Sequence, residues 1–149
     1  DIVNMRYIES KGHENKGEFD LSYWTVKGST PLRSVPEDWL TAAHFMIAKQ
    51  LFVSMGGFDC QFEYNTFACS DLMLRIQALG GTFLHSETNI STADWSGASH
   101  SDHKPVEDGQ NSDLPKYWTI WHTEYQTRRQ IDINNHLKYP EVWERRFGG

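Results

Sequence analysis

The clearest periodic segment of the chain runs from Thr66 to Leu79. Its apolar residues recur about one helical turn apart and share one stripe: Leu72, Met73, Ile76 and Leu79. Asp71 falls in the early turns, where a carboxylate suits the positive end of the helix dipole. Gly80-Gly81 follows, and glycine directly after a periodic segment is typical of a helix end. The pattern therefore predicts a helix over residues 66–79.

Shorter patterns predict strands on both sides of this helix. Three segments are strand-like: Asp1–Ile8, Leu21–Val26 and Thr82–His85. The middle of Thr41–Met55 is predicted to be a buried strand. Its last part, Gln50–Met55, is predicted to form a short helical turn that Gly56-Gly57 ends.

The last third of the chain begins with a long polar segment. Asp94–Asp113 is rich in Ser, Gly, His and Asp, and it is predicted to be a loop. Large apolar residues then repeat at helical spacing through Gln130: Leu114, Trp118, Trp121 and Tyr125. Trp residues at this spacing are expected in a core more often than on a binding surface. We interpret the 149 residues as one α/β domain with long loops.

Composition and charge exclude several classes of protein. Apolar residues make up 38% of the chain, but six Trp, six Tyr and eight Phe add enough area for a folded core. The 20 acidic residues outnumber the 14 basic residues, so the net charge of −6 argues against a nucleic-acid-binding protein. No apolar run approaches the roughly 20 residues needed to span a bilayer, and no signal peptide is visible. We therefore expect a cytoplasmic protein without a transmembrane segment. Cys60 and Cys69 are interpreted as reduced thiols.

One segment has a more specific pattern. Met55-Gly56-Gly57-Phe58-Asp59 is followed by an acidic loop, by Asp71-Leu72-Met73-Leu74-Arg75 and by Gly80-Gly81. From Thr41 to His85 the chain resembles glycosyltransferase family 2, in which a strand leads into Gly-Gly-Phe-Asp and a helix carries Asp-Leu-x-x-Arg. The resemblance implies a GT-A-type fold, a mixed sheet with flanking helices. Asp102–Val106 and Asn111–Asp113 are similar to the mobile loop of one branch of that family.

The resemblance implies the transfer of a sugar from a nucleotide-sugar donor to a carbohydrate or lipid-linked acceptor, as in an inverting hexosyltransferase. One carboxylate would remove the proton of the acceptor hydroxyl. The family places a Glu-Asp pair shortly before its Asp-Leu, but those positions are Ala68 and Cys69 here. The remaining candidates for the base are Asp71, Glu63 and Asp59. Each has a structural alternative: a helix-start carboxylate, a solvated loop charge and a turn-stabilising side chain, respectively.

The family also implies a divalent metal, Mn²⁺ or Mg²⁺, held by an Asp-x-Asp motif in its N-terminal half. This chain has no such Asp-x-Asp motif, so the resemblance implies the C-terminal, acceptor-side part of a glycosyltransferase. The alternative is a diverged domain that keeps the fold and binds carbohydrate, or acts structurally, without catalysis.

Further candidates follow from residue chemistry. Sugars stack on aromatic rings while carboxylates, amides and flexible glycine turns meet their hydroxyls. The candidate substrate-binding residues are Trp39, His44, Gly56, Gly57, Asp94, Trp95 and Lys104. Related transferases often place one C-terminal histidine on the metal, so the resemblance implies His103 or His122 as a candidate metal ligand. The alternative for His103 is a solvated loop histidine. Arg128 and Arg129 are further candidates for contact with a diphosphate, with surface solvation as the alternative.

Overall fold

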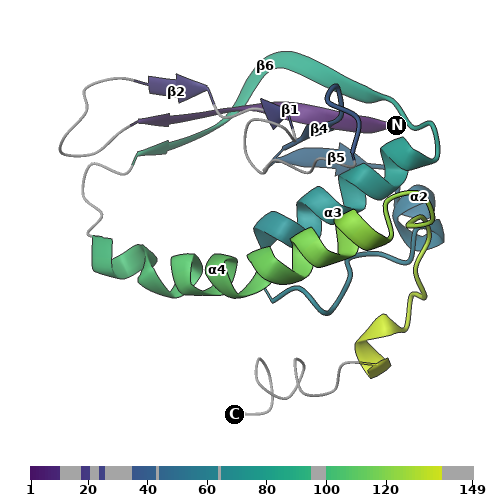
Figure 1. The fold of residues 1–149 in the computed structure, drawn as a ribbon. Helices are drawn as coiled ribbons and strands as arrows, with labels where there is room; N and C mark the ends of the chain where they lie inside the picture. The colour runs from purple at the N-terminus through teal and green to yellow at the C-terminus, as the bar shows by residue number, and fades with distance from the viewer. Residues whose placement is uncertain are drawn as a thin grey trace.

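A four-stranded mixed sheet forms one layer of the structure (Figure 1). The computed structural model describes residues 1–10, 18–20, 24–25, 35–42, 44–63, 65–94 and 100–138. The central strand, β1 (Ile2–Ser10), pairs antiparallel with β5 (Phe45–Ile47) near its start and with β2 (Glu18–Asp20) near its end. Along its other edge it pairs in parallel with β6 (Phe83–Asp94). In a separate two-stranded sheet, β3 (Trp24–Thr25) pairs antiparallel with β4 (Leu40–Thr41).

The helices lie on one side of this sheet. They are α2 (Lys49–Ser54), α3 (Asn65–Ala78), α4 (His100–Thr123) and the 3₁₀ helix η1 (Asn135–Lys138). The predicted helix over residues 66–79 is confirmed as α3, and the predicted helical turn is confirmed as α2. Gly80 has a φ of 82°, and the N–H of Gly81 donates to the carbonyl of Ile76, which closes α3 as a left-handed C-cap. Leu79 is consequently outside the helix and half exposed.

The core consists of two clusters, one on each side of α3. Toward the sheet, the cluster contains Ile2, Ala42, Met55, Leu72, Met73 and Ile76. Toward α4, it contains Val35, Phe62, Phe67, Ala68, Leu74, Tyr117, Ile120 and Trp121. Every residue from Ser70 to Ile76 is buried, so α3 lies between two layers, and its polar residues need partners inside the protein.

The strand predicted within Thr41–Met55 is present, but it is only partly buried. In β5 the side chains alternate across the sheet, so Phe45 and Ile47 pack toward α3 while Met46 is 52% exposed. Val3 pairs with Met46 on one side and with Leu84 on the other, and Leu84 is also half exposed. The second face of the sheet therefore carries a partly exposed apolar row.

The prediction of a loop over residues 94–113 is wrong for residues 100–113, which form the first part of α4. The strand before it is also longer than predicted, because pairing with β1 extends β6 to Asp94. Asp102–Val106 and Asn111–Asp113, which were expected to belong to a mobile loop, lie in this helix. The helix ends at Thr123 rather than continuing to Gln130.

The buried face of α4 also differs from the predicted one. Tyr117, Ile120 and Trp121 are buried, whereas Trp118 is 40% exposed. Asp113 lies one turn before Tyr117 and is fully buried, so the inward stripe includes a carboxylate that an apolar pattern cannot detect.

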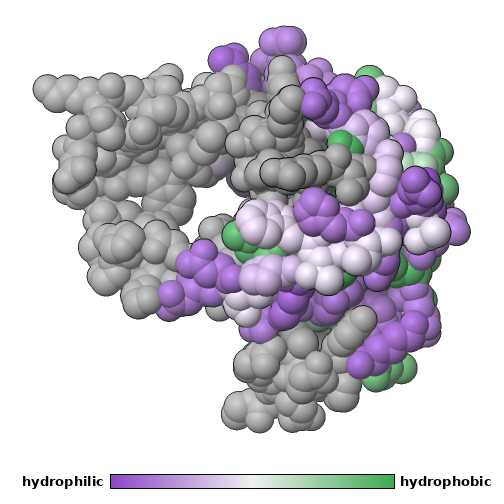
Figure 2. Space-filling model, viewed as in Figure 1, coloured by the Kyte–Doolittle hydropathy of each residue, from purple (hydrophilic) through white to green (hydrophobic). Residues whose placement is uncertain are grey.

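No helix in the described part of the chain is long and apolar enough to cross a membrane. On the face drawn in Figure 2, hydrophilic residues cover most of the described surface, and hydrophobic residues form small separate patches.

Candidate functional site

The site is centred on the turn that follows α2. Gly56 and Gly57 have φ values of 83° and 72°, a left-handed conformation that glycine adopts without strain. The Ile131 N–H donates to the carbonyl of Met55 at 3.1 Å. A Cβ atom on Gly56 would lie far inside the contact distance of the Ile131 carbonyl. The sequence predicted that these glycines let a sugar approach, but at Gly56 the close approach is made by the protein's own chain.

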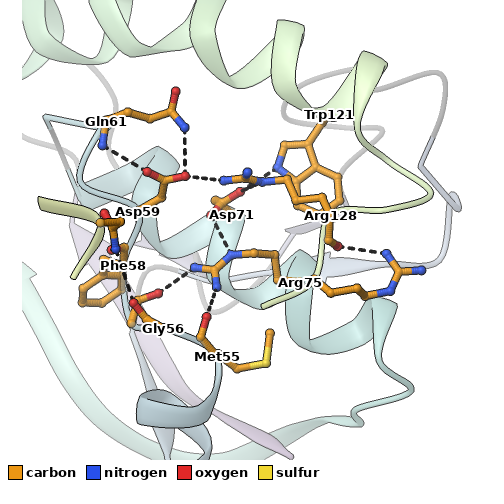
Figure 3. Close-up of polar contacts among 12 residues, drawn as sticks. Met55, Gly56, Phe58, Asp59, Gln61, Asp71, Arg75, Trp121 and Arg128 are labelled. Carbon is orange, nitrogen blue, oxygen red and sulfur yellow. Dashed lines mark hydrogen bonds and ion pairs between the residues drawn. The ribbon is translucent and has the colours of Figure 1, made fainter. Parts of the chain in front are cut away.

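Arg75 joins this turn to α3. The side chain is fully buried, and its Nε donates to Asp71 Oδ2 at 2.8 Å. Its two terminal nitrogens donate to the carbonyls of Met55 at 2.7 Å and Gly57 at 2.6 Å (Figure 3). The planar guanidinium thus satisfies three acceptors from two segments, a geometry that a lysine cannot reproduce. The Gly-Gly turn and the Asp-Leu-x-x-Arg helix are therefore one bonded unit.

Arg128 adds a second buried link. It donates from Nε to Asp71 Oδ1 and from a terminal nitrogen to Asp59 Oδ2, both at 2.6 Å. Burial alone would lower the pKa of Arg128, but Asp71 and Asp59 hold that pKa above its ordinary value. Arg128 is therefore a permanent cation between two carboxylates. The prediction that it is either a diphosphate contact or a solvated surface charge is wrong, because its side chain is 5% exposed and ion-paired.

Asp71 does not lie at a helix start, as the sequence predicted, but near the middle of α3. Its carboxylate is fully buried and accepts bonds from Arg75, Arg128 and the indole N–H of Trp121, the last at 3.0 Å (Figure 3). With both oxygens occupied by cationic or indole donors, this carboxylate is well placed to fix the packing of α3 against α4. It is poorly placed to meet an acceptor hydroxyl.

Asp59 stabilises the turn after Gly57. Its Oδ1 accepts from the Gln61 backbone N–H at 3.1 Å, and its Oδ2 accepts from the Gln61 side chain at 2.8 Å. Burial alone would raise the pKa of Asp59, but the bonds from Arg128 and Gln61 outweigh it and hold that pKa below the ordinary value. The geometry matches the structural alternative foreseen for Asp59, a turn-stabilising carboxylate.

Glu63 lies at the edge of this buried unit. Its backbone N–H donates to Asp113 Oδ2 at 2.8 Å, which ties the segment after Asp59 to α4. Its side chain is 16% exposed, and Oε1 lies 3.8 Å from the ammonium of Lys116. Of the three carboxylates predicted as the base, Glu63 is the most exposed.

The positions of the expected Glu-Asp pair hold no carboxylate. Ala68 is buried in the cluster between α3 and α4. Burial raises the pKa of the neighbouring Cys69 thiol to about 11, so this thiol is protonated near neutral pH and does not replace a carboxylate base.

The predicted substrate-binding residues are spread over the molecule. Trp39 packs against the α3–α4 core cluster and contacts Tyr125 edge-to-face at 6.1 Å. The ring of His44 contacts that of Tyr7 in a tilted arrangement, with ring centroids 4.1 Å apart. Asp94 ends β6 and Lys104 lies in α4, but their side chains are outside the described residues, and so is all of Trp95. The described part of the chain therefore does not bring these candidates together with Glu63.

His103 and His122 are alternative candidates for one metal-binding histidine. His103 and His122 lie near opposite ends of α4, so their backbones are separated by about 28 Å. His122 lines an open cavity of about 400 Å³ together with Thr123, Tyr125, Gln126 and Thr127. The described residues include no group of three or more His, Cys, Asp or Glu side chains that could hold a metal ion. The side chains that the structure describes therefore do not fit the metal that the resemblance implies.

Several residues of the site had no signal in the sequence. Asn135 in η1 accepts from the Cys60 N–H at 2.6 Å and donates to the carbonyl of Phe58 at 3.2 Å. Asp113 and Lys116 lie in or beside the segment predicted to be a loop. The described segment after α4 thus closes over the Gly-Gly turn, an arrangement that depends on contacts across more than 70 residues.

Comparisons with protein-family models, with curated proteins and with solved structures gave no match. The function is therefore inferred from the residue pattern and from the geometry of the site.

Proposed function

We propose that this chain is the acceptor-side part of a nucleotide-sugar glycosyltransferase with a GT-A-type fold. The reaction would be an inverting transfer of a sugar to a hydroxyl group. One observation supports this most strongly: the separated residues of the family pattern bond directly to one another. Arg75 holds Asp71 together with the carbonyls of Met55 and Gly57.

The bonding explains why this combination of residues occurs together. Two buried carboxylates and two buried guanidiniums balance in charge, and each charge has hydrogen-bonding partners. Such a unit rigidly fixes the segment that leaves the Gly-Gly turn. A rigid support of this kind is what a reacting group needs, because small displacements lower the rate of an oriented reaction.

Within this proposal, Glu63 is the general base, and Asp59 and Asp71 are positioning residues. Glu63 would accept the proton of the acceptor hydroxyl while the oxygen of that hydroxyl forms a bond to the anomeric carbon of the donor sugar. The bond from that carbon to the nucleotide diphosphate breaks, and the electron pair leaves with the diphosphate. Displacement from the opposite face inverts the anomeric carbon.

Because the described residues do not fit a metal site, no step is assigned to a metal ion here. The donor-binding groups are likewise not assigned to residues of this chain.

The test is a transfer assay on the full-length gene product. The donors are UDP-glucose, UDP-galactose, UDP-N-acetylglucosamine and GDP-mannose, each with Mn²⁺ and a set of p-nitrophenyl glycosides as acceptors. Glu63→Gln should lower kcat by about 10²–10⁴-fold, the usual contribution of a general base. Because the Glu63 side chain is partly exposed, the thermal unfolding temperature of the Glu63→Gln protein should change little.

Two variants provide the controls. Glu87→Gln changes an exposed carboxylate on β6 and should leave turnover unchanged. Asp71→Asn removes a buried charge between two arginines, so it should lower stability as well as turnover. Full activity of Glu63→Gln would refute Glu63 as the base, and a folded wild-type protein that transfers none of the four sugars would contradict the proposed function.

A further inference from the structure

The turn of α4 from Asp113 to Tyr117 contacts the segment that contains Glu63. Asp113 accepts the backbone N–H of Glu63, and the ring of Phe62 meets Tyr117 edge-to-face at 6.1 Å. Lys116 follows Asp113 by three residues, so both side chains lie on the same side of the helix. The position of Glu63 relative to Lys116 is therefore fixed by backbone and core contacts.

Lys116 is held more loosely than the arginines of the site. Its Nζ lies 3.3 Å from the carbonyl of Gln61, 3.5 Å from Asp113 Oδ1 and 3.8 Å from Glu63 Oε1. These separations are longer than the usual range for a charged hydrogen bond, about 2.7–2.9 Å. The side chain is 37% exposed, and an ammonium has three N–H donors. Lys116 thus keeps donor capacity that faces solvent.

The geometry points to Lys116 and Glu63 as a pair that binds one hydroxyl of the carbohydrate acceptor, an inference that rests on the proposed function. A hydroxyl both donates and accepts, whereas an ammonium only donates and a carboxylate only accepts. The 3.8 Å gap between Nζ and Oε1 is too long for a strong direct bond, but one oxygen can bridge it.

The local charge favours a neutral ligand. Glu63 and Asp113 are acidic and Lys116 is basic, so the three groups together carry one negative charge. A phosphate at this position would meet two carboxylates, which disfavours it. The oxygen of a sugar hydroxyl can accept from Lys116 while its proton points to Glu63. Lys116 then also stabilises the negative charge that develops on the oxygen as the proton leaves.

The experiment measures steady-state transfer by the full-length gene product while the concentration of a p-nitrophenyl glycoside acceptor is varied. Lys116→Met should raise the acceptor KM by about 10–100-fold, the loss expected for one charged hydrogen bond. The donor KM should not change. Lys116→Arg should restore most of the affinity, because it keeps the positive charge and N–H donors.

Lys138→Met is the matched control, because Lys138 forms an exposed ion pair with Asp132 at 3.6 Å. The role of Lys116 would be overturned if Lys116→Met and Lys138→Met had the same acceptor KM. If Glu63→Gln were still inactive in that case, the proposed function would stand. The role of Lys116 would also be overturned if inorganic phosphate competed with the acceptor in the wild type but not in Lys116→Met. That result would indicate an anion site. Absence of transfer by the wild type would overturn the proposed function itself.

Discussion

Replacing Arg128 with Met tests how strongly the buried charges hold the fold together. Met keeps much of the side-chain length but removes every donor. The variant would lose the bonds to Asp59 and Asp71, both 2.6 Å long and almost completely buried. Asp71 would keep Arg75, and Asp59 would keep Gln61, so neither carboxylate would be left without a donor.

The expected cost follows from this geometry. Removing one partner of a buried ion pair costs about 3–5 kcal/mol, which is a large share of the stability of a small domain. The assay is equilibrium unfolding in urea, followed by tryptophan fluorescence. With a urea dependence of about 2 kcal/mol per molar, the midpoint should fall by about 2 M.

Arg129→Met is the matched control for this measurement. The Arg129 guanidinium donates to two backbone carbonyls, those of Tyr125 and Arg128, and its loss should cost about 1 kcal/mol or less. Equal urea midpoints for Arg128→Met and Arg129→Met would refute the reasoning, because the buried carboxylates would then not depend on Arg128.

Two further predictions concern the same unit. Gly80 has a φ of 82° and open space around it, so Gly80→Ala should lower the free energy of unfolding by about 1–2 kcal/mol. In Gly56→Ala the added Cβ would also meet a backbone carbonyl, and the free energy of unfolding should fall by about 3–4 kcal/mol in the same urea assay. The pKa of Asp59 in the folded state lies below its ordinary value of 3.8, so its stabilising effect is complete at neutral pH and is lost as the pH falls below about 4. Thermal unfolding between pH 7 and pH 2 should show this loss in the wild type and a smaller one in Asp59→Asn; identical curves would contradict it.

The sequence predicted the elements whose signals are local. The helix α3 was recognisable because its apolar stripe and the glycines that end it lie within one segment of 16 residues, from Thr66 to Gly81. The turn at Gly56-Gly57 was recognisable for the same reason. In both places the deciding physics is the conformation of a few adjacent residues.

Elements that depend on distant partners were predicted less well. The strand β6 extends to Asp94 because it pairs with β1, about 80 positions earlier in the chain. The first half of α4 has no apolar period in its sequence, and the buried Asp113 accepts a hydrogen bond from Glu63, 50 residues earlier. The local sequence pattern does not reveal that β6 pairs with β1 or that Asp113 bonds to Glu63. Residues 94–113 were therefore predicted to be a loop.

The candidate site shows the same limit in a different form. The residue pattern named Asp59 and Asp71 as candidate bases and Arg75 as part of the motif, and the structure places all three in one network of buried hydrogen bonds (Figure 3). It did not show that Arg128 lies between the two carboxylates, because that link spans 57 residues to Asp71 and 69 to Asp59. Their burial changes the roles we propose for them, from deprotonating a substrate to positioning Glu63.

Mass spectrometry of the acceptor after incubation with each nucleotide sugar is the most direct test of sugar transfer. The full-length wild-type protein should add one hexose or N-acetylhexosamine mass to a p-nitrophenyl glycoside, and Glu63→Gln should add almost none over the same time. An acceptor that keeps its original mass with all four donors, while the wild-type protein remains folded, would contradict the proposed function.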